Sequence, residues 1–153
     1  MPRIGVISDT HGLVRPQALT ALAGAELIVH AGDIGGPEVL DALRAVAPVV
    51  AVRGNNDRGP WAAALPETDV VETGGRSLYV LHDVKALDLD PRAAGFAAVI
   101  AGHSHQPRIE RRDGVLYLNP GSAGPRRFRL PIAVARLDVD ASGIEAEIVA
   151  LDV

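Results

Sequence analysis

Short apolar runs, each followed by a polar loop, recur through the first third of the chain. The runs are residues 3–7 (RIGVI), 27–30 (LIVH) and 49–52 (VVAV). The first two are followed by helix-like stretches. Pro16 suits the first turn of a helix to about Ala23, and Pro37 suits the first turn of another. This order predicts a βαβαβ opening, and open α/β sheets bind ligands at the carboxyl ends of their strands.

The second half of the chain changes to apolar runs, several of them joined by glycine-containing turns such as ETGGRS and RRDGV. The runs that we expect to be strands are residues 69–73, 76–81, 97–101, 115–118, 132–139 and 143–150. Turns this short favour mostly antiparallel pairing. No repeat or linker interrupts the sequence, so we expect residues 1–153 to form one domain.

The composition argues against several classes of protein and of site. The chain has no cysteine, so a metal ion would have to be held by imidazole, carboxylate or amide groups. A net charge of −4 and an aromatic content of 3% argue against stable nucleic-acid binding. No apolar run approaches the roughly 20 residues of a membrane span, and no signal peptide pattern opens the chain. We therefore expect a soluble, cytoplasmic protein without membrane contact.

Candidate metal ligands follow five of the predicted strands. They share one position, the loop just beyond an apolar run, and they are Asp9, His11, Asp33, Asn55, His82, His103 and His105. In the motifs Asp-x-His and His-x-His, alternate residues can point the same way toward one ion. Taken singly, each motif fits a turn or a cap equally well, so only the ordered set favours a metal site.

That ordered set of motifs, Asp-x-His, Gly-Asp, Gly-Asn, His and Gly-His-x-His, resembles the calcineurin-like metallophosphoesterases. GHSHQP and LNPGS (residues 118–122), together with the short chain, resemble the small prokaryotic phosphodiesterase branch. The similarity runs from about Arg3 to Ser122. It implies an α/β fold, a four-layer α/β/β/α sandwich of two mixed β-sheets flanked by helices.

The resemblance also implies two divalent metal ions that share Asp33 as a bridging ligand. The first ion would be held by Asp9, His11, Asp33 and His105, and the second by Asp33, Asn55, His82 and His103. Manganese is favoured on family grounds, with iron, zinc or nickel as alternatives. The implied reaction is in-line attack on phosphorus by a hydroxide that bridges the two ions.

The chain departs from the family pattern at two positions. Asn56 stands where many relatives have a histidine that protonates the leaving group, so we expect Asn56 to position substrate or to have no chemical role. Asp83 stands where relatives often have glycine, and is expected to alter substrate access, to hydrogen-bond His82, or simply to lie at the surface. His30 is expected to be structural or to support a metal ligand without binding metal itself, and Asp57 to support the site or to cap a helix near Trp61.

The function predicted from these features is metal-dependent hydrolysis of small phosphate esters, most simply as a phosphodiesterase. The alternative is a non-catalytic scaffold that binds proteins, because a retromer subunit has the same fold. The retained ligand set favours the enzyme. A homodimer or a higher homo-oligomer is left open, with the apolar C-terminal strands as a surface for association.

Overall fold

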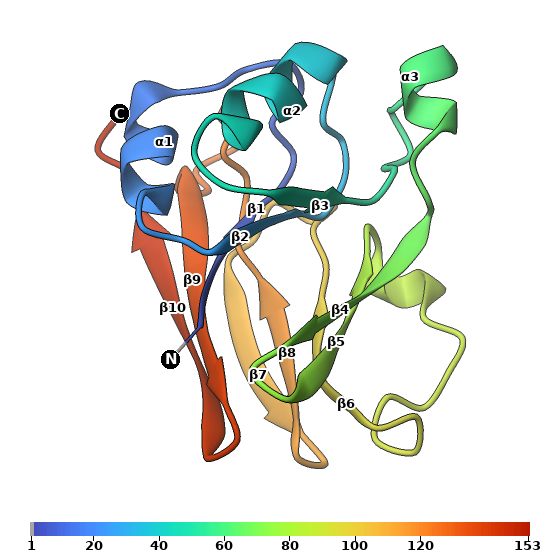
Figure 1. The fold of residues 1–153 in the computed structure, drawn as a ribbon. Helices are drawn as coiled ribbons and strands as arrows, with labels where there is room; N and C mark the ends of the chain where they lie inside the picture. Colours follow the sequence, from blue (N-terminus) through green and yellow to red (C-terminus); the bar gives the residue numbers. More distant parts are fainter. Residues whose placement is uncertain (1) are drawn as a thin grey trace.

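The computed structural model describes residues 2–153 as two five-stranded β-sheets packed face to face (Figure 1). The first sheet has the order β10-β9-β1-β2-β3. Its strands are β1 (Arg3–Ile7), β2 (Leu27–His30), β3 (Val49–Ala51), β9 (Ala133–Asp140) and β10 (Gly143–Ala150). Because β1, β2 and β3 are parallel, their carboxyl ends and the loops that follow lie at one edge of the sheet.

The second sheet has the order β4-β5-β6-β8-β7. Its strands are β4 (Thr68–Thr73), β5 (Arg76–Leu81), β6 (Phe96–Ile100), β7 (Arg108–Arg112) and β8 (Val115–Asn119). The hairpins β4–β5 and β7–β8 are antiparallel, whereas β5, β6 and β8 are parallel. The expected antiparallel pairing therefore holds for only half of this sheet, because the long segment between β5 and β6 allows a crossover.

Each of the three α-helices has proline in its first turn, where the missing N–H group costs nothing. They are α1 (Pro16–Leu22), α2 (Pro37–Arg44) and α3 (Pro60–Ala63). Ala18 and Leu22 of α1 and Leu40 and Leu43 of α2 belong to an apolar cluster with Ile28 of β2. Helices α1 and α2 therefore cover the outer face of the first sheet (Figure 1).

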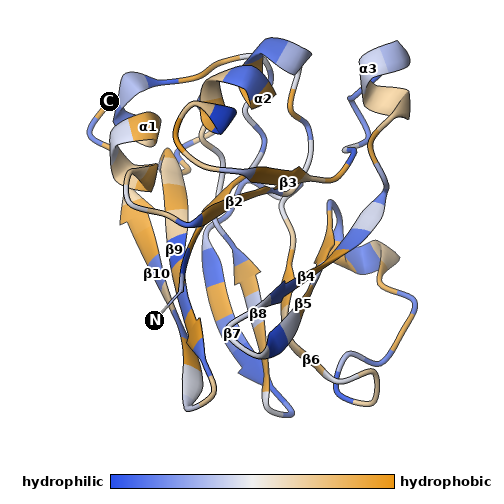
Figure 2. Ribbon diagram, viewed as in Figure 1, coloured by the Kyte–Doolittle hydropathy of each residue, from blue (hydrophilic) through white to orange (hydrophobic). Residues whose placement is uncertain are grey.

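The main core lies between the two sheets. Its buried side chains come from both of them, for example Val6 and Leu137 from the first sheet and Leu78, Ile100 and Leu116 from the second. Figure 2 shows β2 and β3 as mostly hydrophobic, in contrast to the largely hydrophilic β7, while β9 alternates between the two. Strand β7 was not expected, because its sequence RIERR lacks the apolar alternation of a half-buried strand.

The outer face of the second sheet is covered differently from the expected helical layer. Within residues 2–153, its cover consists of the 3₁₀-helix η1 (Val84–Ala86) and the loop 87–95. Leu87 and Leu89 of that loop pack against Tyr79, Leu81 and other apolar side chains of this face. The two mixed sheets and the α/β class are confirmed, while the fourth layer is one 3₁₀ turn and a loop. No helix among the described residues has the length and apolar character needed to cross a membrane.

Candidate metal centre

The loops that carry the predicted ligands meet at one edge of the two sheets and are tied together by backbone hydrogen bonds. The N–H of Asp9 donates to Gly32 O (3.0 Å), and the N–H of His11 donates to Asp33 O (2.9 Å). In the second sheet, the N–H of Gly102 donates to His82 O (2.9 Å). The parallel strands therefore bring residues far apart in sequence into one constellation.

The backbone is left-handed at most of the predicted ligands. Seven non-glycine residues in the described chain have positive φ, and five of these are predicted ligands: Asp9 (56°), His11 (48°), Asp33 (56°), His103 (71°) and His105 (64°). Such a conformation is uncommon outside glycine and costs energy, so strained residues cluster at functional sites. Because five such residues lie at the predicted site, the fold must hold their backbone in a conformation that these residue types do not favour on their own.

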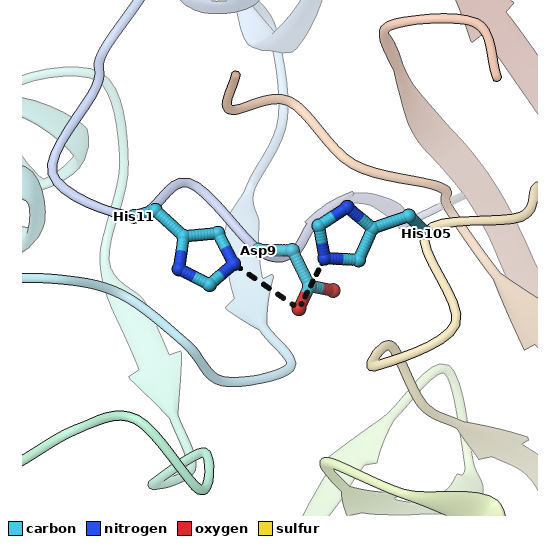
Figure 3. A group of neighbouring side chains, drawn as sticks. All are labelled: Asp9, His11 and His105. Carbon is cyan, nitrogen blue, oxygen red and sulfur yellow. Dashed lines mark ion pairs between the residues drawn. The ribbon is translucent and has the colours of Figure 1, made fainter. Parts of the chain in front are cut away.

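Asp9, His11 and His105 form the first of two groups whose side chains could hold a metal ion (Figure 3). His11 Nε2 lies 3.9 Å and His105 Nε2 lies 3.4 Å from the same oxygen, Asp9 Oδ1. The other oxygen, Oδ2, accepts hydrogen bonds from Ser8 Oγ (2.7 Å) and from the N–H of His103 (3.0 Å). One carboxylate oxygen is thus anchored to the protein, while the other faces three imidazoles, those of His11, His105 and, at 3.8 Å, His82.

Two buried atoms of this group fit a cation. Asp9 Oδ1 and His11 Nε2 are both buried and have no hydrogen-bond partner within the described chain. A buried carboxylate oxygen without a partner is costly, and a bound cation would compensate both the charge and the lone pairs. The residues present therefore suit a divalent metal ion with nitrogen and oxygen ligands.

Asp33, His82 and His103 form the second group. His82 Nδ1 must donate to the carbonyl oxygen of Ala31 (2.7 Å), which leaves Nε2 directed at the centre of the group. That nitrogen lies 3.3 Å from Asp33 Oδ2 and 3.3 Å from His103 Nδ1. Burial opposes protonation of His82, but the hydrogen bond to Asp33 and the charge of Asp9 raise its pKa.

Asp33 lies between the two groups. The same oxygen, Oδ2, is 3.8 Å from His11 Nε2 of the first group and 3.3 Å from His82 Nε2 of the second. Although burial acts in the opposite direction, hydrogen bonds from His82 and Asn56 lower the pKa of Asp33 well below its ordinary value. An ionised carboxylate in this position has the geometry that a shared ligand needs.

The two asparagines that follow β3 lie differently. Asn55 is exposed and lines an open cavity of about 570 Å³ together with His82 and His103. Asn56 is turned toward Asp33, because its backbone N–H donates to Asp33 Oδ1 (2.9 Å) and its side-chain Nδ2 donates to Oδ2 (3.0 Å). Asn56 thus orients a carboxylate in this structure, and its expected role in substrate positioning stays a prediction.

Asp57 supports the site through the backbone. Its Oδ1 accepts hydrogen bonds from the N–H groups of Ile34 (2.9 Å) and Gly35 (3.0 Å), and its Oδ2 accepts one from Gly54 (2.9 Å). This buried carboxylate joins the Asp33 loop to the Asn55 loop. Of the two expected roles, support of the site is the one that the structure shows, since Gly59 stands at the N-cap of α3.

His30 is structural, as expected. Its ring is fully buried, accepts a hydrogen bond from the N–H of Gly32 at Nδ1 (3.1 Å) and lies 3.0 Å from Thr10 Oγ1 at Nε2. Burial lowers the pKa of His30 to about 3, and the positive neighbour His82 adds to the effect. The neutral ring therefore links the end of β2 to the Asp9 loop.

Asp83 and Asn119 both contact the GHSH loop. Asp83 Oδ1 accepts a hydrogen bond from the N–H of Lys85 (3.0 Å), while Oδ2 lies 3.7 Å from His103 Nε2, so Asp83 faces His103 and not His82. Asn119 Nδ2 donates to Gly102 O (2.9 Å) and Ser104 Oγ (3.1 Å), so the LNPGS segment supports the GHSH loop.

Close packing explains why glycine precedes some ligands. A Cβ atom on Gly102 would overlap Ser8 Oγ and crowd Asp9 Oδ2, and one on Gly54 would overlap the backbone and carboxylate of Asp33. Ser8, which anchors Asp9, was missed by sequence reasoning. The only signal for it is its position beside Asp9, and such serines are common in turns.

Two mixed sheets with clustered imidazole and carboxylate groups at their carboxyl edge define an α/β protein with a candidate metal centre. The chain belongs to the calcineurin-like phosphoesterase superfamily, whose domain matches residues 2–142. A probable metallophosphoesterase from Methanothermobacter thermautotrophicus is 35% identical to it, with 95% of this chain and 91% of the relative covered. The family resemblance expected from the motifs is confirmed, and this is a family of metal-dependent phosphoesterases.

Solved structures with the same fold include a phosphodiesterase and several Vps29 proteins. An archaeal phosphodiesterase superimposes with a TM-score of 0.80 at 22% identity, covering 96% of this chain and 99% of that one. Vps29 from Entamoeba histolytica, complexed with Zn²⁺, superimposes with a TM-score of 0.74 at 25% identity, covering 98% and 99%. The archaeal phosphodiesterase, below 25% identity, supports the fold alone.

Proposed function

We propose that this chain is a metal-dependent phosphodiesterase that hydrolyses small phosphate esters with two divalent cations. The observation that carries the proposal is the position of Asp33, whose Oδ2 faces one histidine from each ligand group. The proposed ligands are Asp9, His11, Asp33 and His105 for one cation and Asp33, Asn55, His82 and His103 for the other. The proposal is also supported by a curated relative, 27% identical, that is named a phosphodiesterase.

The donor set fits the proposed ions and substrate. Imidazole, carboxylate and amide donors without thiolate favour manganese, with iron, zinc or nickel as alternatives. When bound, such a pair of cations supplies a water of lowered pKa as nucleophile and neutralises charge on the phosphate. The protein contributes the carboxylates of Asp9 and Asp33 and otherwise neutral ligands, so the loaded site keeps a positive charge that attracts an anionic ester.

Asn56 sets a limit on the proposed chemistry. Its amide cannot donate a proton to a leaving alkoxide in the way that a histidinium can, although it can hold Asp33 in its orientation. The proposed enzyme therefore works best on esters whose leaving groups need little protonation.

Substitution of the shared carboxylate tests the proposal. Metal-depleted protein is assayed on bis(p-nitrophenyl) phosphate with added Mn²⁺, and metal content is measured in parallel. Asp33→Asn should lose at least about 10²-fold in kcat/KM and most of its bound metal, because the shared negative ligand is removed. Asp41→Asn, the same change at an exposed position of α2, is the matched control. Unchanged metal-dependent hydrolysis in Asp33→Asn would contradict the proposal.

A protein-binding scaffold is the second candidate, favoured by the similarity to Vps29 structures. The two candidates predict different behaviour of the wild-type protein. An enzyme hydrolyses a diester in proportion to its metal content, whereas a scaffold binds metal without turnover. Single-turnover and steady-state assays on the metal-loaded protein therefore separate them.

A further inference from the structure

Two cavities open on either side of His103 and Asp83, and both residues line both of them. The first cavity, of about 570 Å³, also contains Asn55 and His82, which belong to the candidate metal centre. The second, of about 330 Å³, extends from the GHSH loop over the outer face of the second sheet. A phosphate held at the metal centre would therefore have room for one substituent on each side.

The floor of the second cavity is apolar. It includes Val99 of β6, Ala101 just after β6 and the ring of Tyr117 on β8, which lie on one face because alternate residues of an extended chain point the same way. This is the face that η1 and the loop 87–95 cover in place of an α-helix. The cavity therefore lies over the part of the apolar sheet face that η1 and the loop 87–95 leave uncovered. It extends to the GHSH loop, which carries His103 and His105.

The rim of the second cavity is charged, and three of its charged side chains pair with one another. Glu110 Oε2 lies 3.0 Å from Arg108 Nη2, and Glu110 Oε1 lies 3.2 Å from Arg112 Nε. The Arg112 guanidinium also lies over the ring of Tyr117, 4.3 Å from its centroid. These contacts leave an apolar floor within a rim of nearly balanced charge.

The lining of the first cavity differs in chemistry. Four carboxylates, those of Asp57, Glu67, Asp83 and Asp88, face a single guanidinium, that of Arg53. Arg53 is itself paired with Glu67 at 2.9 Å. An apolar group gains little there, since burying it would desolvate charged side chains. The two cavities therefore suit different substituents.

We propose that the second cavity is a subsite for the ester substituent of a phosphodiester that does not leave, and that it takes an apolar alkyl group. The other substituent then lies in the acidic first cavity. This inference rests on the proposed phosphodiesterase function and adds a substrate class, an unsymmetrical diester with one apolar arm. A monoester would occupy only one of the two cavities.

A series of diesters with one common leaving group tests the subsite. Methyl, ethyl, propyl and butyl p-nitrophenyl phosphates release the same p-nitrophenolate, so their chemical step is closely matched. With Mn²⁺-loaded wild-type protein, kcat/KM should rise about fourfold for each methylene that enters the cavity. The rise should stop when the chain exceeds the cavity length.

Filling the cavity should remove this dependence. Ala101→Leu places a larger side chain on the floor, and the series should become flat or decline with chain length. Ala93→Leu, the same change at an exposed position in the loop 87–95, is the matched control and should keep the wild-type slope. Circular dichroism establishes folding of each variant. If Ala101→Leu does not fold, Val84→Trp on the exposed rim narrows the same entrance.

The outcomes separate the subsite from the proposed function. No metal-dependent hydrolysis of any diester by the wild-type protein would overturn the phosphodiesterase proposal itself. Hydrolysis of all four diesters at equal kcat/KM would overturn the subsite and leave that function standing. A wild-type slope that persists in folded Ala101→Leu or Val84→Trp would also overturn the assignment to this cavity. If kcat/KM rises with alkyl chain length in the wild type and in Ala93→Leu but not in these variants, the assignment of the subsite to the second cavity is supported.

Discussion

The predicted metal ligands can be recognised in the sequence, whereas the residues that hold those ligands in place cannot. The seven predicted ligands are recognisable because their types and order follow strand ends, and the structure brings six of them into two groups and places Asn55 beside the second. The hydrogen bonds of Ser8 to Asp9, Asp57 to three N–H groups and Asp83 to Lys85 carry no such signal. The contacts of Asp57 with the backbone of Ile34 and Gly35 depend on tertiary structure, whereas the short-range contacts of Ser8 and Asp83 are common in turns and do not point to a metal site.

Asp83 is predicted to strengthen binding of the second cation by orienting His103. Its carboxylate lies 3.7 Å from His103 Nε2, on the opposite side of the ring from the nitrogen that faces His82. Asp83→Asn should lower the affinity for the second equivalent of Mn²⁺ about tenfold, as seen for carboxylates that support metal-bound histidines. Titration calorimetry measures this directly. Asp88→Asn, in the same cavity, is the control, and an equal loss in both variants would argue for a general electrostatic effect.

Asn56 is predicted to make the rate depend steeply on the leaving group. In the wild-type protein, log kcat should fall as the leaving-group pKa rises, because no side chain protonates the departing oxygen. Asn56→His should flatten this dependence and raise the rate on poor leaving groups by up to about 10²-fold. Asn56→Gln keeps the amide and should behave like the wild type. A flat dependence in the wild-type protein would mean that another acid is present.

At the scale of elements, sequence patterns predicted the strands that have one or both faces buried. They did not predict a strand whose side chains are mostly exposed. Strand β7 has four charged residues out of five and pairs only with β8, so its hydrogen bonds and not its side chains define it. The form of the fourth layer, a 3₁₀ turn and a loop, escaped the sequence patterns for a related reason. In the segment 87–95, Leu87 and Leu89 pack against the sheet, and two apolar residues two positions apart do not specify a helix.

The link that His30 makes between β2 and the Asp9 loop is predicted to make the metal-free protein acid-sensitive. The pKa of His30 is about 3 in the folded chain and 6.5 when unfolded, so between these values the unfolded chain binds the additional proton. The free energy of unfolding should therefore fall as the pH drops through this window, by up to about 1.4 kcal/mol per pH unit from this group.

Urea unfolding in a chelator at several pH values between 4 and 7 measures the effect. His30→Gln cannot take up this proton, so its free energy of unfolding should depend less steeply on pH than that of the wild type. Equal slopes in the two proteins would show that His30 is not responsible.

For the whole molecule, one core joins both sheets, with side chains from β1, β2, β4, β5, β6, β8, β9 and β10. The sequence predicts a single domain, and this core leads us to expect one cooperative unfolding transition. Two separate transitions in calorimetry, one for each sheet, would contradict that expectation.

Metal binding is predicted to stabilise the whole molecule. A ligand at 100 times its Kd adds about 2.7 kcal/mol to the free energy of unfolding, which corresponds to roughly 5–10 °C in Tm for a domain of this size. Mn²⁺ should therefore raise the Tm of the wild type and of Asp41→Asn, and EDTA should reverse the rise. The Tm of Asp33→Asn should respond much less. An equal rise in all three proteins would point to binding elsewhere.

The left-handed backbone at Asp9, His11, Asp33, His103 and His105 has a consequence for how an ion would arrive. Hydrogen bonds between the loops hold these residues in their unfavourable conformations, so the conformational work of assembling the centre is done as the chain folds. Little reorganisation of the loops is then left for the binding step. The rate constant for metal binding should accordingly rank different ions in the order of the rates at which their hydrated forms exchange water.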